Sequence, residues 1–246
     1  MTMNQQTTST KPKMSPETRH EIIKWIRQAA VGWVGYGLIL FLSAGTIEWA
    51  WGWLLLIVLA LFLAAHPIIL IPINPDLLVE REKGLRAKGV KSWDIWIAAL
   101  AGGVFPMASW IVAGLDFRLG WTEPLPLAVH LSGLLAMVLG FALFLWAMAS
   151  NAFFAEGVRI QTERGHTVAT GGPYRYVRHP GYAGAMLAMM ASPALLGSPW
   201  ALIPAIVSAA LYAVRTSLED KLLRAELPGY EEYAQQTRYR LVPGIW

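Results

Sequence analysis

Residues 171–184 read GGPYRYVRHPGYAG and combine two arginines, one histidine and three tyrosines in a short stretch. The adjacent carboxylates Glu219 and Asp220 follow about 40 residues later, in the stretch LEDKLL. Arginine offers a forked donor to a carboxylate, and tyrosine faces attract cations. Histidine and tyrosine also form hydrogen bonds, and a carboxylate can bind an ammonium group or hydroxyls. These residue types together are suited to bind a small, polar, charged molecule.

The segment between the two motifs explains how they could meet. Residues 181–214 carry no charge and are interrupted by Ser-Pro-Trp at 198–200, which predicts two short helices folded into a hairpin. Such a hairpin leaves one membrane face at Gly181 and returns to it near Arg215. We therefore expect Arg178 to Tyr182 to lie beside Glu219 in space.

The rest of the chain has the composition of a membrane protein. Charged residues make up 15% of the sequence, against about 25% in a typical soluble protein, and hydrophobic residues make up 55%. Four further uncharged stretches cover 29–46, 49–73, 95–115 and 124–155. A membrane span needs about 20 apolar residues. The sequence predicts an all-α integral membrane protein with about six transmembrane helices, a C-terminal helical hairpin and a cofactor pocket at the cytoplasmic face.

The positive charge follows the predicted topology. If the chain crosses the membrane six times, 19 of the 20 lysines and arginines lie on one side of the membrane and only Arg118 lies on the other. Short cytoplasmic loops are enriched in these residues, so the basic side is assigned to the cytoplasm and both termini lie there. The net charge of +4 is thereby explained without nucleic acid, which we do not expect as a partner.

Three regions are predicted. Residues 1–28 form a polar cytoplasmic N-terminus whose first dozen residues we expect to be disordered, and the first span is interpreted as a retained anchor. Residues 29–149 form a four-span membrane scaffold, and residues 150–246 hold the candidate chemistry. The chain has no cysteine, which excludes disulfides, thiolate nucleophiles and cysteine-based metal sites, and no metal site is predicted.

Each polar residue also has a simpler interpretation when it is considered alone. Arg175 and Tyr176 could be interfacial residues, with the arginine reaching toward the head groups. Asp220 and Arg224 are spaced as a surface helix pair. Glu219 lies close enough to a span end to be solvent-exposed. Only the whole constellation favours a binding site.

The C-terminal motifs, taken in order, carry a family resemblance. RHPGYAG, an apolar hairpin, LEDKLL and then LPGYEEYAQQTRYRLVPGIW resemble the isoprenylcysteine carboxyl methyltransferases and the related membrane phospholipid methyltransferases, over residues 150–246. LPGY stands where the eukaryotic enzymes have Phe-Gly-Glu-Glu-Tyr, and Asp220 replaces a second Glu, as in a bacterial branch. The resemblance implies an S-adenosylmethionine-dependent methyltransferase in the bacterial inner membrane, with a lipophilic or membrane-associated acceptor and membrane lipids as partners.

The resemblance also implies roles for individual residues. Glu219 would bind the cofactor's ammonium or ribose hydroxyls, Arg178 would position a carboxylate acceptor, and His179 or Glu219 would take a proton from an amine or thiol. The residues assigned to catalysis are Arg178, Glu219 and Tyr182, and those assigned to cofactor binding are Tyr174, Arg175, His179, Pro180, Tyr182, Gly184, Glu219 and Asp220.

Neighbours on a helix point about 100° apart, which separates the two acids. Glu219 shares the apolar face of Leu222 and Leu223, whereas Asp220 has Arg224 one turn on. We therefore expect Glu219→Gln to impair cofactor binding and Asp220→Asn to be much milder.

Several alternatives stay open at this point. The acceptor could be an isoprenylcysteine-like carboxylate, a phospholipid head group or a small thiol. A membrane reductase that uses NADPH is a second class, because sterol C14 reductases share a similar C-terminal cofactor region. A non-enzymatic protein such as a transporter is a third class. Against it, the spans carry no ionisable residues that could line a transport pathway. Asp94, at the start of a span, is interpreted as a partner of the helix dipole. The sequence leaves the oligomeric state open.

Overall fold

A computed structural model describes residues 15–246, and every regular element in that range is helical. The predicted disorder of the first dozen residues lies outside the described range. The helices are α1 (Pro16–Ala44), α2 (Ala50–Ile73), α3 (Pro75–Lys83), η1 (Gly84–Arg86), α4 (Ser92–Ala99), η2 (Leu100–Val104), α5 (Phe105–Leu119), α6 (Leu127–Ala149), η3 (Thr162–Arg164), η4 (Gly172–Arg175), α7 (Pro180–Leu196), α8 (Leu202–Glu226) and α9 (Tyr230–Gln236).

The expectation of an all-α integral membrane protein is confirmed. Within residues 15–246, five helices are long and apolar enough to cross a bilayer, namely α1, α2, the continuous helix Ser92–Leu119, α6 and α8. The remaining predicted span corresponds to α7, which has 17 residues and is therefore about 25 Å long. The hairpin expected from residues 181–214 is present as α7 and α8.

Two helices extend beyond the uncharged stretches. Ser15 caps the N-terminus of α1 by accepting a hydrogen bond from the Thr18 amide at 3.0 Å, and Pro16 occupies the first helical position. The described part of the polar N-terminal region is therefore helical. Similarly, α8 continues to Glu226, so the acidic pair belongs to the same rigid helix as the second arm of the hairpin.

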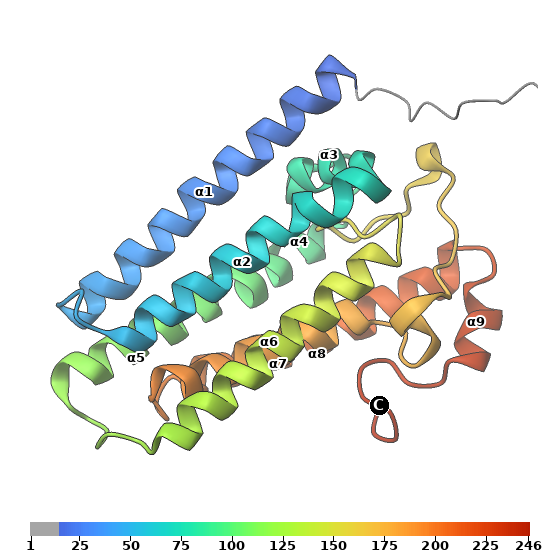
Figure 1. Cartoon of the computed structure of the whole chain (residues 1–246). Helices are drawn as coiled ribbons and strands as arrows, with labels where there is room; N and C mark the ends of the chain where they lie inside the picture. The colour runs from blue at the N-terminus through green and yellow to red at the C-terminus, as the bar shows by residue number, and fades with distance from the viewer. Residues whose placement is uncertain (1–14) are drawn as a thin grey trace, which may run out of the picture.

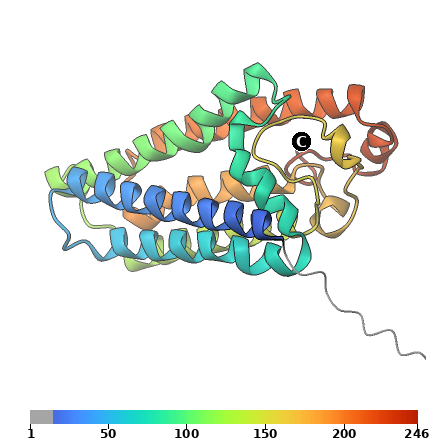
Figure 2. The same cartoon turned by 90° about the horizontal axis from the view of Figure 1, so that it is seen from above.

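The connecting segments gather at the two ends of the bundle (Figure 1). The turns after α1, α5 and α7 lie at one end, and α3, residues 150–179 and α9 lie at the other. Viewed from above, α1 and α2 run side by side along the bundle, and the 150–179 segment curls over the far end (Figure 2). The structure thus collects the cation-rich segments at one end.

The most extensive helix pairing, between α6 and α7, depends on glycine. A Cβ built on Gly184 would lie 2.5 Å from the Gly140 carbonyl oxygen, and one on Gly140 would lie 2.6 Å from the Ala188 amide nitrogen. Such distances admit no side chain, so the two backbones are in direct contact. This contact positions the start of α7, where the RHPGY motif lies.

The cation distribution predicts the orientation of the bundle. Reporter domains fused after residues 47 and 118 should be found outside the cell, and fusions after residues 85, 165 and 246 in the cytoplasm, because lysine and arginine are retained on the cytoplasmic side. Paired alkaline phosphatase and fluorescent-protein fusions would measure this. A cytoplasmic fusion at 118 would contradict the assignment.

Candidate functional site

The RHPGY motif is a turn that the C-terminal tail holds in place. The 3₁₀ helix η4 ends at Arg175, and α7 begins at Pro180, where the missing amide proton costs nothing. Between them, the backbone amides of Arg178 and His179 donate to the carbonyls of Tyr239 and Arg240, both at 2.9 Å. The end of the chain is therefore part of the site.

Asp220 is the centre of a buried ionic network. Its side chain is 0% exposed, and Arg178 donates to both oxygens, from Nε at 2.7 Å and from Nη2 at 3.0 Å. Arg240 donates from Nε at 3.0 Å, the Tyr230 hydroxyl at 3.1 Å, and His179 Nε2 lies 3.3 Å away. One carboxylate of α8 thus joins the turn before α7, α9 and the tail.

Arg178 is fully engaged in this network. Its Nη1 donates to the Thr237 and Arg238 carbonyls at 2.8 and 2.7 Å. Burial disfavours the charge of Arg178, but its hydrogen bond to Asp220 and the charge of that carboxylate raise the pKa of the guanidinium. Arg178 also lines the neighbouring cavity, but Asp220 and the tail take four of its hydrogen bonds, so its predicted role in positioning an acceptor stays a prediction.

The interpretation of Asp220 as a surface partner of Arg224 is wrong. Arg224 does lie 3.3 Å from Oδ2, but the carboxylate is buried and has stronger partners. Asp220 also does not line the neighbouring cavity, which argues against its predicted contact with a cofactor. The tail at residues 237–240 covers this side of α8, and the helix spacing alone could not show that.

A cavity of about 510 Å³ lies beside the network, within the range of small-molecule sites. One wall comes from residues 151–169, and the other walls come from α7, α8 and α9 and from single residues of the N-terminal helices and α6, among them Phe62, Arg81 and Phe144. At the membrane end it is lined by Ala98 and by Gly102 and Gly103 of η2. That element is a π-helical turn, a distortion that is often found at functional sites. The cavity therefore connects the loop end of the protein with its apolar bundle.

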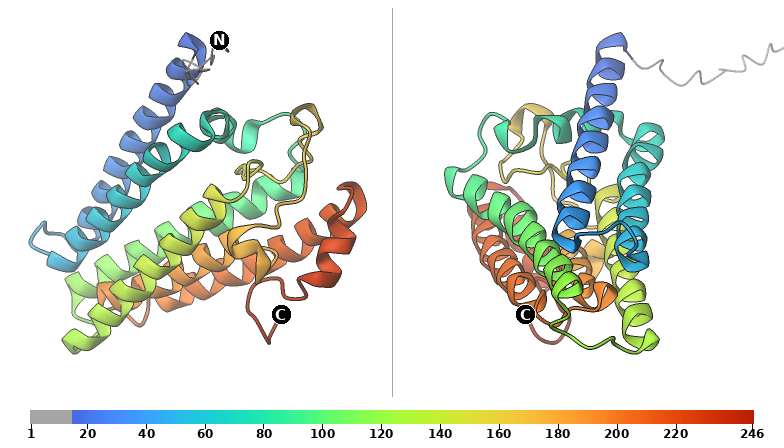
Figure 3. Two further views of the ribbon diagram at one scale, coloured as in Figure 1. Left: turned by 45° about the vertical axis from the view of Figure 1, so that its right-hand side comes forward. Right: turned by 90° about the vertical axis from the view of Figure 1, so that its left-hand side faces the viewer.

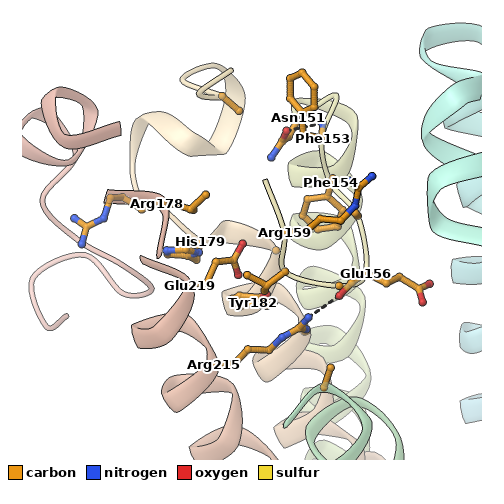
Figure 4. A pocket seen from close by; sticks show the side chains of 18 of the residues that line it. Asn151, Phe153, Phe154, Glu156, Arg159, Arg178, His179, Tyr182, Arg215 and Glu219 are labelled. Atoms are coloured by element: carbon orange, nitrogen blue, oxygen red, sulfur yellow. Dashed lines mark hydrogen bonds between the residues drawn. The ribbon is translucent and has the colours of Figure 1, made fainter. Parts of the chain in front are cut away.

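Glu219 points into this cavity, as predicted. Figure 4 shows its carboxylate between His179 and Tyr182, while the guanidinium of Arg178 points away. Within residues 15–246, its Oε2 is buried without a hydrogen-bond partner. Burying such an oxygen is costly unless a donor or cation satisfies it. The arrangement favours a bound group that supplies one.

The other predicted residues divide into two groups. His179, Tyr182 and Tyr174 line the cavity, and the rings of His179 and Tyr182 stack with centroids 5.8 Å apart. Arg175 is exposed, so its predicted contact is not supported. Pro180 begins α7, and Gly184 packs against the α6 backbone, and neither lines the cavity.

The lining tyrosines are hydrogen-bond donors rather than bases. Burial raises the pKa of Tyr174 and Tyr230, and it raises the pKa of Tyr233 to about 12. The Tyr233 hydroxyl donates to the Tyr174 carbonyl at 2.7 Å. Their hydroxyls therefore stay protonated at neutral pH and shape the wall between the cavity and α9.

A second buried ion pair was missed by the sequence analysis. Asp94 is 0% exposed and accepts two hydrogen bonds from Arg215, at 2.6 and 2.9 Å. It also accepts from the Val158 amide at 2.7 Å, and Arg215 donates to the Glu156 carbonyl at 2.5 Å. Asp94 is thus more than the dipole partner that was expected, because the pair clamps the 150–179 segment onto α4 and α8.

Residues 151–169, which line the cavity, contribute further polar side chains that no sequence motif had indicated. Asn151 donates to the Tyr174 hydroxyl at 3.1 Å, and Arg159 pairs with Glu80 of α3 at 2.7 Å. The His166 ring stacks on Phe153 at 4.5 Å, and burial together with Arg159 and Arg164 lowers its pKa to about 4. His166 is therefore neutral at physiological pH.

Comparison with known proteins adds one finding. Residues 133–225 match the model of the isoprenylcysteine carboxyl methyltransferase family, a range that begins within α6 and ends near the end of α8. It includes the RHPGY motif, the hairpin and both acids, whereas the resemblance seen in the sequence continued to residue 246. No curated protein matches the chain at a significant level.

Proposed function

We propose that the protein is a membrane methyltransferase that uses S-adenosylmethionine as its methyl donor. The proposal is supported by the match of residues 133–225 to the model of the isoprenylcysteine carboxyl methyltransferase family. We further propose that the acceptor is lipophilic or membrane-associated, with a carboxylate like that of isoprenylcysteine. The reaction would take place at the cytoplasmic face of a bacterial inner membrane, with both termini on that side.

The unpartnered oxygen of Glu219 is the observation that carries this proposal. The cofactor has an ammonium group and ribose hydroxyls, and each can satisfy a buried carboxylate. Tyr182 and the neighbouring rings offer faces for stacking and for a sulfonium cation. The residues present therefore fit the cofactor. When bound, it supplies a methyl group, whose bond to sulfur breaks with the electron pair left on sulfur while the acceptor atom forms the new bond.

The residues around the cavity favour an acceptor that is already anionic. The Arg178 donors are occupied, His179 Nε2 faces Asp220, and the tyrosines stay protonated, so Glu219 would be left as the base. A carboxylate acceptor needs no base, only alignment and exclusion of water. A phospholipid head group or a thiol would need one.

Binding measurements separate this proposal from a reductase. Purified protein should release or absorb heat when titrated with S-adenosylhomocysteine and should show no response to NADPH, because Glu219 meets an ammonium group that the nicotinamide nucleotide lacks. Stabilisation by NADPH without any response to either sulfur nucleoside would overturn the proposal. Incubating membranes with labelled S-adenosylmethionine and identifying the labelled product would then reveal the acceptor class.

A further inference from the structure

A second cavity of about 830 Å³ is lined by α3 and the N-terminal helices and contains none of the residues of the Asp220 network. Its walls come mainly from α1, α2, α3 and η1, at the end of the bundle where Ile22 and Trp25 of α1 pack against Leu77 and Leu78 of α3 (Figure 3). The two cavities adjoin, because both are lined by Phe62, Arg81, Leu85, Phe144 and Glu156. No role has been assigned to this space so far.

Arg81 lies at the junction of the two cavities. The residue is 8% exposed, and among the described residues its Nε has no hydrogen-bond partner. Its polar contacts are long, with Nη1 3.3 Å from the Phe154 carbonyl and Nη2 3.5 Å from the partly exposed carboxylate of Glu156. The guanidinium also lies 5.9 and 5.8 Å from the ring centroids of Phe144 and Phe154. A buried guanidinium with such weak partners is poorly compensated. Burial accordingly lowers the pKa of Arg81.

The second cavity is apolar inside and basic at its mouth. Trp25, Leu63 and Phe144 form the inner wall. The mouth carries exposed Arg86 and Lys88, and further lysines of α1 and α3 that are paired with acids. A molecule that fits this distribution has a hydrocarbon part and a negative group. The hydrocarbon would lie between α1 and α2, and the negative group would lie beside Arg81.

We propose that this second cavity binds the methyl acceptor as a lipophilic carboxylate, with Arg81 holding the carboxylate at the opening into the cofactor cavity. The inference rests on the proposed function and assigns to Arg81 the positioning role that the sequence suggested for Arg178, whose hydrogen bonds to Asp220 and the tail engage it elsewhere. The two oxygens of a carboxylate can accept hydrogen bonds from the Arg81 guanidinium, and the negative charge compensates its buried positive charge. Arg81 lies outside residues 133–225, so the family match does not include it.

The same geometry distinguishes acceptor from product. Methylation of a carboxylate gives a neutral ester, which no longer forms an ion pair with Arg81. We therefore expect the carboxylate to bind more tightly than its methyl ester, and that preference should disappear when Arg81 loses its charge.

The test uses the purified full-length protein in a neutral detergent, with fluorescent cis-parinaric acid and its methyl ester as probes. The acid should bind the unaltered protein at least tenfold more tightly than the ester, and Arg81→Gln should weaken acid binding by roughly 10- to 150-fold while leaving ester binding unchanged. Arg86→Gln, at the exposed mouth, is the matched control and should change acid binding by less than about threefold.

A second variant tests the cavity without touching the charge. Leu63→Trp adds bulk to the inner wall and should weaken binding of both probes, with S-adenosylhomocysteine binding retained. Equal binding of acid and ester to the unaltered protein, or unchanged acid binding in both Arg81→Gln and Leu63→Trp, would overturn the inference. S-adenosylhomocysteine could fail to bind while cis-parinaric acid still binds the unaltered protein more tightly than it binds Arg81→Gln. In that case only the proposed cofactor is wrong. If Arg81→Gln does not fold, the acid-to-ester ratio and Leu63→Trp decide the question.

Discussion

Glu219→Gln should weaken S-adenosylhomocysteine binding by about 30- to 150-fold, which corresponds to a loss of roughly 2–3 kcal/mol. The substitution keeps the size of the side chain but removes the negative charge from a buried, unpartnered position in the cofactor cavity. Folding should be unaffected, because within residues 15–246 Oε2 holds no other group. Isothermal titration calorimetry on the purified protein measures the effect.

A control variant and a second ligand show whether the effect is specific to Glu219 and which group of the ligand it contacts. Glu226→Gln removes a carboxylate from the exposed end of the same helix and should leave binding unchanged. Titration with 5′-methylthioadenosine, which has no ammonium group, identifies the contact. If Glu219 binds the ammonium, its substitution will impair S-adenosylhomocysteine alone, and if it binds the ribose, both ligands will be impaired. Full-strength binding of both ligands by Glu219→Gln would remove this residue from the site.

Asp220→Asn should destabilise the folded protein by about 3–5 kcal/mol, the usual cost of breaking a buried ion pair and leaving its partner charged. Arg178 would keep its charge and its burial, and Arg240 would lose its carboxylate partner. The midpoint of thermal unfolding should fall by roughly 10 °C, as measured by intrinsic fluorescence in detergent without any ligand.

A surface ion pair between α8 and α9 provides the control. Glu231→Gln breaks the exposed ion pair with Arg224 and should cost less than about 1 kcal/mol. Glu219→Gln should also leave the midpoint of thermal unfolding unchanged. The two neighbouring acids would then differ in role, because Glu219 affects cofactor binding and Asp220 affects stability. An Asp220→Asn protein with an unaltered midpoint but no cofactor binding would contradict this assignment and show that the network acts on binding rather than on stability.

The sequence predicted the arrangement that brings the site together, because that arrangement follows from hydrophobicity. An uncharged stretch of 34 residues with a central Ser-Pro-Trp can only leave and re-enter one membrane face, which places Glu219 beside His179 and Tyr182. The role of Glu219 as the cavity-facing acid followed from its apolar neighbours on α8.

The assignments of Asp220, Arg178 and Gly184 needed information that local spacing does not contain. Asp220 is buried by a tail that returns from residues 237–240, and the same tail takes the donors of Arg178. Gly184 faces α6, whose register against α7 depends on the glycines of both helices. Likewise, Asp94 and Arg215 are 121 positions apart, and nothing near either residue indicates its partner.

The backbone contact between α6 and α7 restricts how a hydrophobic molecule can reach the protein. If a single added carbon at Gly140 or Gly184 would come within 2.6 Å of the facing backbone, then no acyl or prenyl chain can pass between these helices. A molecule that diffuses in the plane of the bilayer therefore meets a closed flank on that side. A hydrophobic molecule must therefore enter the protein from another side. The rate at which such molecules enter should then depend on how the protein is rotated about the membrane normal when they collide with it.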